Sequence, residues 1–531
     1  MIAAEYLLDL LAQEPAPTRQ RLRTLNKTAS RRLGVPLQRC DALLAAYRQQ
    51  VRDRRRAPSP ALERLFQLNR TRTVSGVTTV TVLTKPYACP GRCVYCPTQQ
   101  RAPKSYLTNE PAVLRAIRHE YDPYAQVRGR LEALRNTGHP TQKIELIVKG
   151  GTWSFYPERY QRWFLARCFD ACNEPPEDIS DGETSWEELA AAQRRNETAT
   201  HRLIGMTIET RPDYVSGGEV SRLRRLGVTR VELGVQHLDD DVLTLIQRDH
   251  TTREIIEATR LLKDAGLKVA YHLMPNLPGS TPALDRWVFE ELFANPAYRP
   301  DTLKIYPCSV VEDAELYDWW RQGRFVPYTT EALAALLVEL KRFVPPYVRI
   351  ERVIRDIPST SIVTGNKATN LREVVARRMR AMGLRCHCVR CREIRDADHA
   401  AELHVVRREY DASGGREIFL SWEDAQERLY ALLRLRRPTQ EVALPELTGA
   451  ALIREVHTYG PSLPVDDHAS EAVQHRGLGR TLVAEAERIA AEEWRCVRVA
   501  VTAGVGVREY YRRLGYALED TYMIKWTAAH S

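Results

Sequence analysis

The chain contains 531 residues, 44% of them hydrophobic and 27% charged, and its formal net charge is +10. This length exceeds a single hydrophobic core, so we expect two or three domains. No apolar stretch approaches the ~20 residues of a membrane span, and the N-terminal segment lacks the basic start and apolar run of a signal peptide. The sequence therefore predicts a cytoplasmic protein that does not span a membrane. In the cytoplasm its eleven cysteines would stay reduced and act as ligands or buried thiols.

Residues 1–75 are strongly basic, with 15 Lys and Arg against 6 Asp and Glu. Leu43, Leu44 and Tyr47 recur there at helical spacing, between the Arg-rich stretches RRLGVPLQR and VRDRRR. Guanidinium groups present a fixed fork of donors to phosphate, and phosphate contacts dominate the affinity of nucleic-acid-binding proteins. We expect a basic helical arm that binds nucleic acid; a merely solvated charged face is the alternative.

Residues 76–345 alternate strand patterns with helical patterns. Repeated βα units of this kind predict parallel strands closing into a partial (β/α)6 TIM-like barrel, with chemistry at the C-terminal ends of the strands. The expected strands are 76–84, 143–150, 202–210, 229–235, 267–273 and 302–306.

Three cysteines, Cys89, Cys93 and Cys96, follow the first expected strand in the stretch ACPGRCVYCP. Three thiolates can hold a [4Fe–4S] cluster and leave one iron open to S-adenosylmethionine. The Cys-x3-Cys-x2-Cys spacing, with Tyr95 before the last cysteine, is the radical-SAM signature, which predicts 5′-deoxyadenosyl radical chemistry. A zinc knuckle with a remote fourth ligand, or thiols without metal, are the alternatives.

Further strand ends carry residues suited to S-adenosylmethionine. Gly150 and Gly151 end the second strand in KGGT, where bare backbone can approach the methionine amino group. Glu209 closes the third strand and Gln236 follows the fourth. Because parallel strands end at one edge of the sheet, we expect all four residues to lie near the cysteines.

Residues 346–400 are expected to form a linker with a second cysteine group. Cys386, Cys388 and Cys391 lie close together in CHCVRC, and Cys308 lies far upstream. Four thiolates would complete a tetrahedral structural zinc site. A competing fourth ligand in His387, a second iron–sulfur cluster, and thiols without metal remain open.

Residues 401–531 change to strand patterns that follow one another in antiparallel style, then a glycine-containing turn and a long helix. Gln474, Gly477 and Gly479 open that helix as in the acetyl-CoA loop of GNAT acetyltransferases, because bare amides at a helix N-terminus bind pyrophosphate. Downstream, GVGVREYYRRLGY places Tyr510 and Tyr511 on a helix that approaches the thioester in that fold. The sequence thus predicts a GNAT α/β domain that binds acetyl-CoA.

A basic arm, a radical-SAM barrel and a GNAT domain in this order resemble the catalytic subunit of Elongator and its stand-alone archaeal and bacterial relatives. Matching stretches include KSYLTNEP, GMTIETRPDY, HLMPNLPG and TGNKATNLREVV. The resemblance implies a tRNA carboxymethyluridine synthase, in which an acetyl radical made from acetyl-CoA adds to carbon 5 of the wobble uridine in the anticodon loop.

The resemblance also implies roles for individual residues. Tyr511 would lie near the thioester, and Lys143 would contact acetyl-CoA from the barrel. The acetyl arm would be lined by Glu455, Val456, His457 and Thr458. The pyrophosphate would be held by Leu478, Gly479 and Arg480. The cluster would need an electron donor, and a homodimer is left open.

Two other functions are considered. A protein lysine acetyltransferase with a structural iron–sulfur domain would need a general base, for which Glu455 is the candidate. The basic arm disfavours this function because it would repel basic peptides. A non-catalytic tRNA-binding module is disfavoured by the intact cysteine motif.

Overall fold

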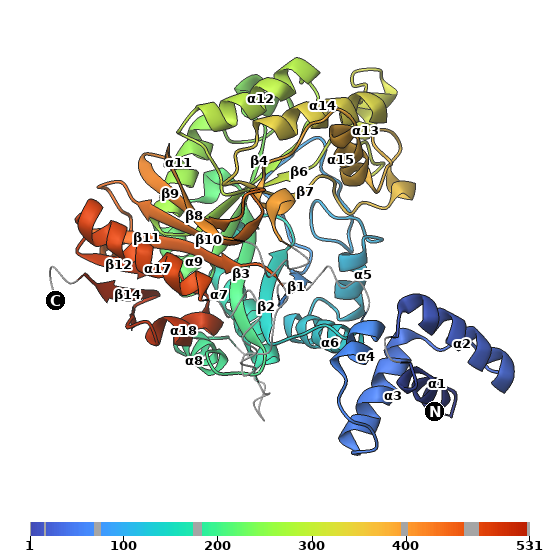
Figure 1. Cartoon of the computed structure of the whole chain (residues 1–531). Coiled ribbons are helices and arrows are strands. Elements are labelled where there is room, and N and C mark those ends of the chain that lie inside the picture. Colours follow the sequence, from blue (N-terminus) through green and yellow to red (C-terminus); the bar gives the residue numbers. More distant parts are fainter. Residues whose placement is uncertain are drawn as a thin grey trace.

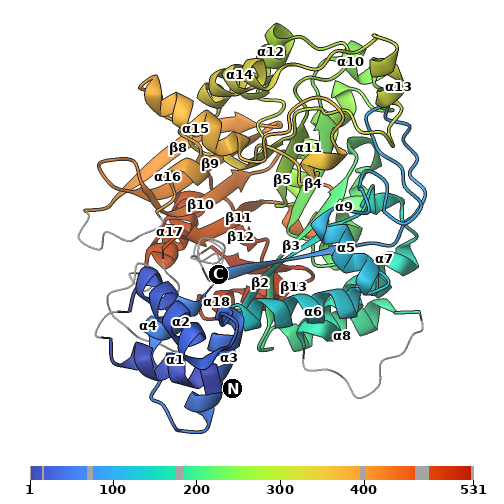
Figure 2. The same cartoon turned by 90° about the vertical axis from the view of Figure 1, so that its right-hand side faces the viewer.

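The computed structural model describes residues 2–14, 17–67, 76–173, 183–394, 402–460 and 477–527. The N-terminal part is a bundle with its own hydrophobic core, which includes Leu8, Leu43, Tyr47 and Phe66. The bundle projects from the rest of the chain (Figure 1) and contacts it at the end of α6 (Pro123–Asn136; Figure 2), where Arg48 donates to the Arg135 carbonyl at 2.8 Å. Its helices are α1 (Ile2–Ala12), α2 (Arg19–Leu33), α3 (Cys40–Arg52) and α4 (Pro60–Phe66).

The first sheet has seven strands in the order β1-β2-β3-β4-β5-β6-β7, and every neighbouring pair is parallel. All six expected strands are present, and the prediction of a partial parallel barrel is confirmed. The strands are β1 (Val77–Leu83), β2 (Lys143–Lys149), β3 (Arg202–Thr210), β4 (Arg230–Gln236), β5 (Lys268–Leu273), β6 (Thr302–Ile305) and β7 (Arg349–Arg352).

The seventh strand extends the sheet into a segment expected to be a linker. Arg349, Ile350, Glu351 and Arg352 form this strand and pair with β6. Only one of the four residues is apolar, so the segment lacks the β-branched run that revealed the other strands. Its pairing depends on β6, which local sequence cannot show.

Helices separate the strands and cover the outside of the sheet (Figure 1). One of them, α11, begins at a capping box of Thr251 and Glu254, and it buries Ile255, Ala258 and Leu262 on one face. The helices of this domain are α5 (Pro111–Arg118), α6 (Pro123–Asn136), α7 (Glu158–Cys172), α8 (Trp186–Asn196), α9 (Gly217–Arg225), α10 (Asp240–Leu245), α11 (Thr252–Asp264), α12 (Pro282–Ala294), α13 (Leu316–Arg321), α14 (Thr330–Phe343), α15 (Leu371–Ala381) and α16 (Val389–Arg392).

The second domain contains a mixed sheet in the order β13-β14-β12-β11-β10-β9-β8, in which only β11 and β12 pair in parallel. This arrangement agrees with the expected α/β domain. Its elements are β8 (His404–Ala412), β9 (Gly415–Glu423), β10 (Leu429–Arg437), β11 (Ala450–Thr458), α17 (Leu478–Arg488), β12 (Arg498–Val501), α18 (Arg508–Arg512), β13 (Ala517–Glu519) and β14 (Tyr522–Trp526).

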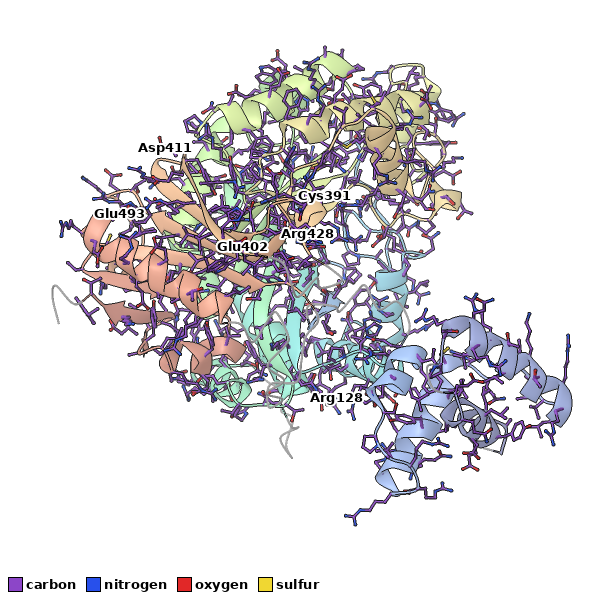
Figure 3. All side chains as sticks on the ribbon, viewed as in Figure 1. Arg128, Cys391, Glu402, Asp411, Arg428 and Glu493 are labelled. Atoms are coloured by element: carbon purple, nitrogen blue, oxygen red, sulfur yellow. The ribbon has the colours of Figure 1, made fainter. Side chains whose placement is uncertain are left out.

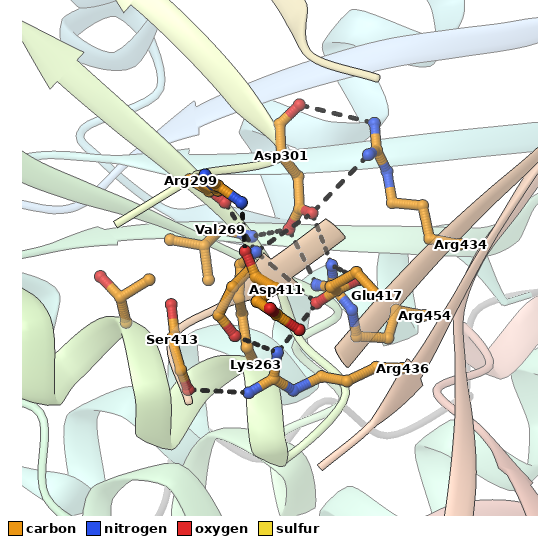
Figure 4. A network of polar contacts seen from close by, with 12 residues as sticks. Lys263, Val269, Arg299, Asp301, Asp411, Ser413, Glu417, Arg434, Arg436 and Arg454 are labelled. Atoms are coloured by element: carbon orange, nitrogen blue, oxygen red, sulfur yellow. Dashed lines mark hydrogen bonds and ion pairs between the residues drawn. The ribbon is translucent and has the colours of Figure 1, made fainter. Parts of the chain in front are cut away.

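Buried charges join the two domains (Figure 4). Arg454 on β11 forms an ion pair with Asp301, which precedes β6, at 2.6 Å, and Arg436 on β10 forms one with Asp264 at the end of α11, also at 2.6 Å. Both acidic residues precede strands of the first sheet, so the second domain packs at the N-terminal edge of that sheet. We call Lys263, Asp264, Asp301, Glu417, Arg434, Arg436 and Arg454 the interdomain network.

A search of the described residues finds no helix that is both long and apolar enough to cross a membrane.

Candidate functional site

The three cysteines of the radical-SAM motif lie on the loop after β1, at the C-terminal edge of the parallel sheet. Cys89, Cys93 and Cys96 are half-buried. Backbone hydrogen bonds of Val94 fix the loop, one donated to the Ile246 carbonyl after α10 at 3.2 Å and one accepted from Leu316 of α13 at 2.7 Å. The loop is therefore held by helices that follow distant strands.

The chemistry of the loop fits an iron–sulfur cluster. Burial raises the pKa of the Cys93 thiol, but Arg248, which donates to its sulfur at 3.2 Å, acts together with Tyr95 and Arg211 to outweigh burial and lower the pKa. In the described chain the three sulfurs do not all lie within 4.8 Å of one another, unlike the ligands of a single ion. A cubane takes one thiolate per iron, so the wider spacing suits a cluster better than one zinc ion.

The other expected strand-end residues lie at the same edge, but they differ in what they touch. A Cβ on Gly150, whose φ is +132°, would lie 1.9 Å from Thr84 Oγ1, so this glycine is required where β2 packs on β1. Gly151 is more open, because its nearest neighbour beyond the adjoining residues would be 3.9 Å away. Gln236, with φ +71°, ends β4 and turns its amide toward Gly234.

Glu209, the fourth expected residue, lies in a network of ion pairs. Lys149 Nζ approaches its carboxylate at 2.9 Å and His272 Nδ1 at 3.3 Å. Burial raises the pKa of Glu209, but Lys149 and His272 hold it well below the usual range. The carboxylate is therefore ionised and can accept hydrogen bonds from a polar ligand.

The second cysteine group is partly assembled. Ligand atoms of Cys386, Cys388 and Cys391 lie within 4.8 Å of one another, so the three thiols can hold one metal ion. Cys391 lies where the chain passes from the first sheet to the second (Figure 3). Cys308 is buried elsewhere, beside Asn276 and Asp285, so the structure does not bring the expected fourth ligand to this group. His387 is exposed and pairs with Glu427 at 3.4 Å.

The glycine turn of the second domain meets two other expected elements. Gly477 is the N-cap of α17 with φ +73°. A Cβ on Gly479 would lie 3.4 Å from Thr458 Oγ1 and 3.7 Å from both Val456 Cγ1 and Tyr510 Oη. The turn, the end of β11 and α18 thus converge on one place. Leu478 and Arg480 follow on α17, and Gln474 lies outside the described residues.

Strand β11 separates from its neighbour before this meeting point. It pairs with β12 only from Ala450 to Ile453, while its pairing with β10 continues to Thr458. Among the described residues, the second half of β11 therefore has no strand partner on the β12 side. A splayed strand of this kind can pair with an extended ligand arm.

Three more of the residues expected to contact acetyl-CoA lie at, or face, the N-terminal edge of the parallel sheet. Lys143 is the first residue of β2, and burial, with a contribution from Arg202, lowers its pKa. Burial also lowers the pKa of His457 to about 4. Glu455 is bound by Lys268 at 3.2 Å and by Arg434 at 2.8 Å. Those two cations hold the pKa of Glu455 well below its usual range despite its burial, which leaves it a poor general base.

The two tyrosines of α18 face different ways. Tyr510 is 40% exposed and reaches toward Gly479, as described above. Tyr511 is buried and packs edge-on against Tyr516 at 5.7 Å. Tyr510 is therefore the residue that lines the glycine turn.

Two family models match the domain that contains the parallel sheet. The Radical SAM superfamily matches residues 83–286, and the Radical_SAM C-terminal domain matches residues 300–381. A tRNA uridine(34) acetyltransferase of Dehalococcoides mccartyi (strain CBDB1) is 47% identical over 461 residues, 86% of this chain and 98% of that protein. Elongator complex protein 3 of Homo sapiens is 41% identical over 472 residues, 86% of this chain and 85% of that protein. The chain belongs to the Elongator complex protein 3 family.

A solved structure from this family has the same fold. The archaeal Methanocaldococcus infernus Elp3 with an N-terminal deletion (1–46) superimposes with a TM-score of 0.74 at 43% identity, and the match covers 86% of this chain and all of that one. Membership in the radical SAM superfamily implies a [4Fe–4S] cluster and S-adenosylmethionine, which agrees with the donor set at the cysteine loop.

Sequence reasoning missed the charged interior of this family member. Glu232 on β4 is fully buried and contacts Lys149, Lys304 at the middle of β6, and His272 on β5. Glu232, Lys304 and His272 each interrupt an apolar strand pattern, VELGV, LKIY and VAYHL in turn, and a buried charge needs a partner. A polar residue within an apolar strand pattern was therefore the sequence signal that could have predicted the buried network.

Proposed function

We propose that this chain is a tRNA carboxymethyluridine synthase, which adds a carboxymethyl group from acetyl-CoA to carbon 5 of the wobble uridine. The relatives named above carry tRNA uridine(34) or Elongator names over nearly the same span. When bound, the cluster and S-adenosylmethionine together supply the 5′-deoxyadenosyl radical. The proposal also includes a cytoplasmic location and an electron donor for the cluster.

The observation that carries the proposal is that buried ion pairs join the two domains on which the two sites would lie. The cysteine loop lies at one edge of the parallel sheet, and β11 approaches the opposite edge, where Glu455 contacts Lys268 on β5. Ion pairs between β2 and β6, centred on Glu232, line the sheet between the two edges. In this proposal, a substrate bound by the second domain reaches the radical site along the inside of the parallel sheet.

Different residues of the chain would bind the cluster, S-adenosylmethionine and acetyl-CoA. Cys89, Cys93 and Cys96 would hold the cluster, with Arg248 favouring the thiolate form of Cys93. Glu209 would accept hydrogen bonds from S-adenosylmethionine, and Gly151 would allow its close approach. Acetyl-CoA would be bound mainly by the second domain, and Lys143 on β2 would contact it from the first domain. The residues of the second domain in this set would be Val456, His457, Thr458, Gln474, Gly477, Leu478, Gly479, Arg480, Tyr510 and Tyr511.

The low pKa of Glu455 disfavours the alternative function, acetylation of protein lysines. A general base must be free to take a proton, and its pKa should lie near the operating pH. The two cations on Glu455 stabilise its ionised form, and the residue joins the domains instead. Glu455 is better assigned to positioning β11.

The proposal also assigns a role to the N-terminal bundle and one to the second cysteine group. The N-terminal bundle would bind the tRNA backbone through exposed arginines such as Arg23, Arg31, Arg39 and Arg52. Cys386, Cys388 and Cys391 would hold a zinc ion where the chain enters the second domain. The fourth zinc ligand is not assigned.

Product analysis tests the proposal. The chain is reconstituted anaerobically with iron and sulfide, then incubated with S-adenosylmethionine, dithionite, acetyl-CoA and tRNA, and the digested tRNA is examined for carboxymethyluridine by mass spectrometry. Cys93→Ala removes a cluster ligand and should abolish both 5′-deoxyadenosine and the modified uridine. Cys40→Ala is the matched control, because Cys40 is also half-buried but lies on α3.

Each outcome has one interpretation. Release of 5′-deoxyadenosine without a modified uridine would mean that the radical site works on another substrate. Acetylated protein without either product would favour the acetyltransferase. Modified uridine that disappears only in Cys93→Ala supports the synthase.

A further inference from the structure

A stack of aromatic rings stands beside the cysteine loop. The Tyr160 and Tyr156 rings stack with centroids 5.2 Å apart and planes at 23°, and the Tyr156 and Tyr87 rings stack at 4.9 Å and 28°. Three rings from two chain segments thus form one column. Tyr87 is its last member and lies two residues before Cys89.

The column is fixed at its inner end and open at its outer end. Tyr156 is buried, and its hydroxyl bonds the carbonyl oxygens of Gly150 at 2.8 Å and Lys85 at 3.0 Å. Tyr160 accepts a hydrogen bond from the Lys85 backbone N–H at 3.1 Å. Tyr87, in contrast, is 40% exposed. Rigid rings that end in an exposed ring form a surface on which another planar ring can stack.

Two more rings extend this surface along the strand ends. Phe155, after β2, lies 6.0 Å from Tyr87, and Tyr214, after β3, lies 6.0 Å from Phe155 with the planes at 89°. Both are half-buried. We call Tyr87, Phe155 and Tyr214 the aromatic rim. Its members follow β1, β2 and β3 in turn, so the rim borders the edge of the sheet that carries the cysteines.

The charge around the rim suits a nucleic acid. Lys85 is exposed, with its ammonium 5.1 Å above the Tyr160 ring, and Arg92 is exposed on the cysteine loop itself. Proteins bind single-stranded nucleic acid with this combination, because cations contact the backbone while aromatic rings stack on unpaired bases. An apolar core role would bury Tyr87 instead of leaving it exposed.

We propose that the aromatic rim, and Tyr87 above all, stacks on an unpaired nucleobase of the tRNA anticodon loop and so positions the target uridine beside the radical site. The inference rests on the proposed function, because it takes tRNA as the substrate. Two residues of chain span at most about 7 Å, so a base on Tyr87 lies close to Cys89. The target base must leave its own stack to react, and a neighbour held on Tyr87 keeps the loop open.

Cross-linking and binding test the rim directly. The reconstituted full chain is mixed with anticodon stem–loop RNAs carrying 5-iodouridine at one loop position at a time, irradiated, and mapped by mass spectrometry. We expect a cross-link to Tyr87 or Phe155 from a position beside the target. Dissociation constants are then measured for the unmodified stem–loop.

Three variants separate stacking from folding. Tyr87→Leu should weaken RNA binding about 5- to 150-fold, which corresponds to about 1–3 kcal/mol per stacked base. Tyr87→Phe keeps the ring and should bind within about twofold of the wild type. Trp287→Leu is the matched control, because Trp287 on α12 is also 40% exposed, and it should leave binding unchanged.

The outcomes distinguish this inference from the proposed function. Equal binding by Tyr87→Leu and the wild type, or a loss shared with Trp287→Leu, overturns the rim. Should Tyr87→Leu lose its iron, Phe155→Leu takes its place under the same criteria. A Tyr87→Leu variant that is impaired only with a protein electron donor, and not with dithionite, would overturn the proposal in favour of donor docking. Failure of the wild type to bind tRNA at all would contradict the proposed function itself.

Discussion

Removal of the Asp301 carboxylate should destabilise the whole chain. Asp301 precedes β6 and is fully buried; it accepts hydrogen bonds from two guanidinium nitrogens of Arg454 at 2.8 and 2.6 Å and from the Val269 N–H at 2.8 Å. Asp301→Ala leaves the Arg454 cation buried with one anion, Glu417, at 2.8 Å. The cost comes from that uncompensated charge more than from the lost hydrogen bonds.

The expected loss is about 3–5 kcal/mol, the range for breaking a buried ion pair by removing one partner. Adding Arg454→Met should recover part of it, because the double variant removes one charge of each sign. Glu417 then keeps Arg436 at 3.0 Å and Lys263 at 3.6 Å. The charge balance of the interdomain network is thus restored.

Urea unfolding followed by circular dichroism measures the two losses. Glu290→Ala is the control, because it removes a surface pair with Arg286 on α12, and such pairs contribute about 0–1 kcal/mol. The reasoning is refuted if Asp301→Ala costs no more than Glu290→Ala, or if the double variant is less stable than Asp301→Ala alone.

Three further predictions concern acid, acetyl-CoA and zinc. Burial raises the pKa values of Asp301 and Glu417, but Arg454, Lys263 and the neighbouring arginines together outweigh burial and hold both pKa values below the usual range. The unfolded chain therefore binds more protons in acid, and stability in urea should fall as pH drops from about 5 toward 2. A flat profile would contradict this. Gly479→Val would push a branched side chain against β11 and α18, so calorimetry should show acetyl-CoA binding weakened at least about tenfold while cleavage of S-adenosylmethionine persists; unchanged affinity would remove Gly479 from the site. Cys388→Ser should lower zinc, measured by plasma mass spectrometry, from one ion per chain toward none, and a wild-type chain without zinc would contradict the assignment.

Sequence patterns were informative where a property is local. β-branched runs gave the first six strands, and spacing gave the cysteine loop and the glycine turn. Local pattern failed where a partner defines the feature. Strand β7 forms because β6 is beside it, and Arg248 reaches Cys93 only through the fold, 155 residues away along the chain. The same reason explains the error at Cys308. A thiol is a suitable zinc ligand, but Cys308 is buried beside Asn276, away from the other three cysteines.

The buried charges bear on how the two proposed sites would work together. One proposed site lies on each domain, so the separation of the sites depends on the contact between the domains. A purely apolar contact tolerates sliding, whereas Arg454 and Arg436 bond specific carboxylates at fixed angles. Arg434 links this contact to function, because it lies 3.8 Å from Asp301 of the first domain and bonds Glu455 on β11 at 2.8 Å. A shift that displaced β11 from the edge of the parallel sheet would therefore also break buried ion pairs, and the cost of breaking them opposes the shift.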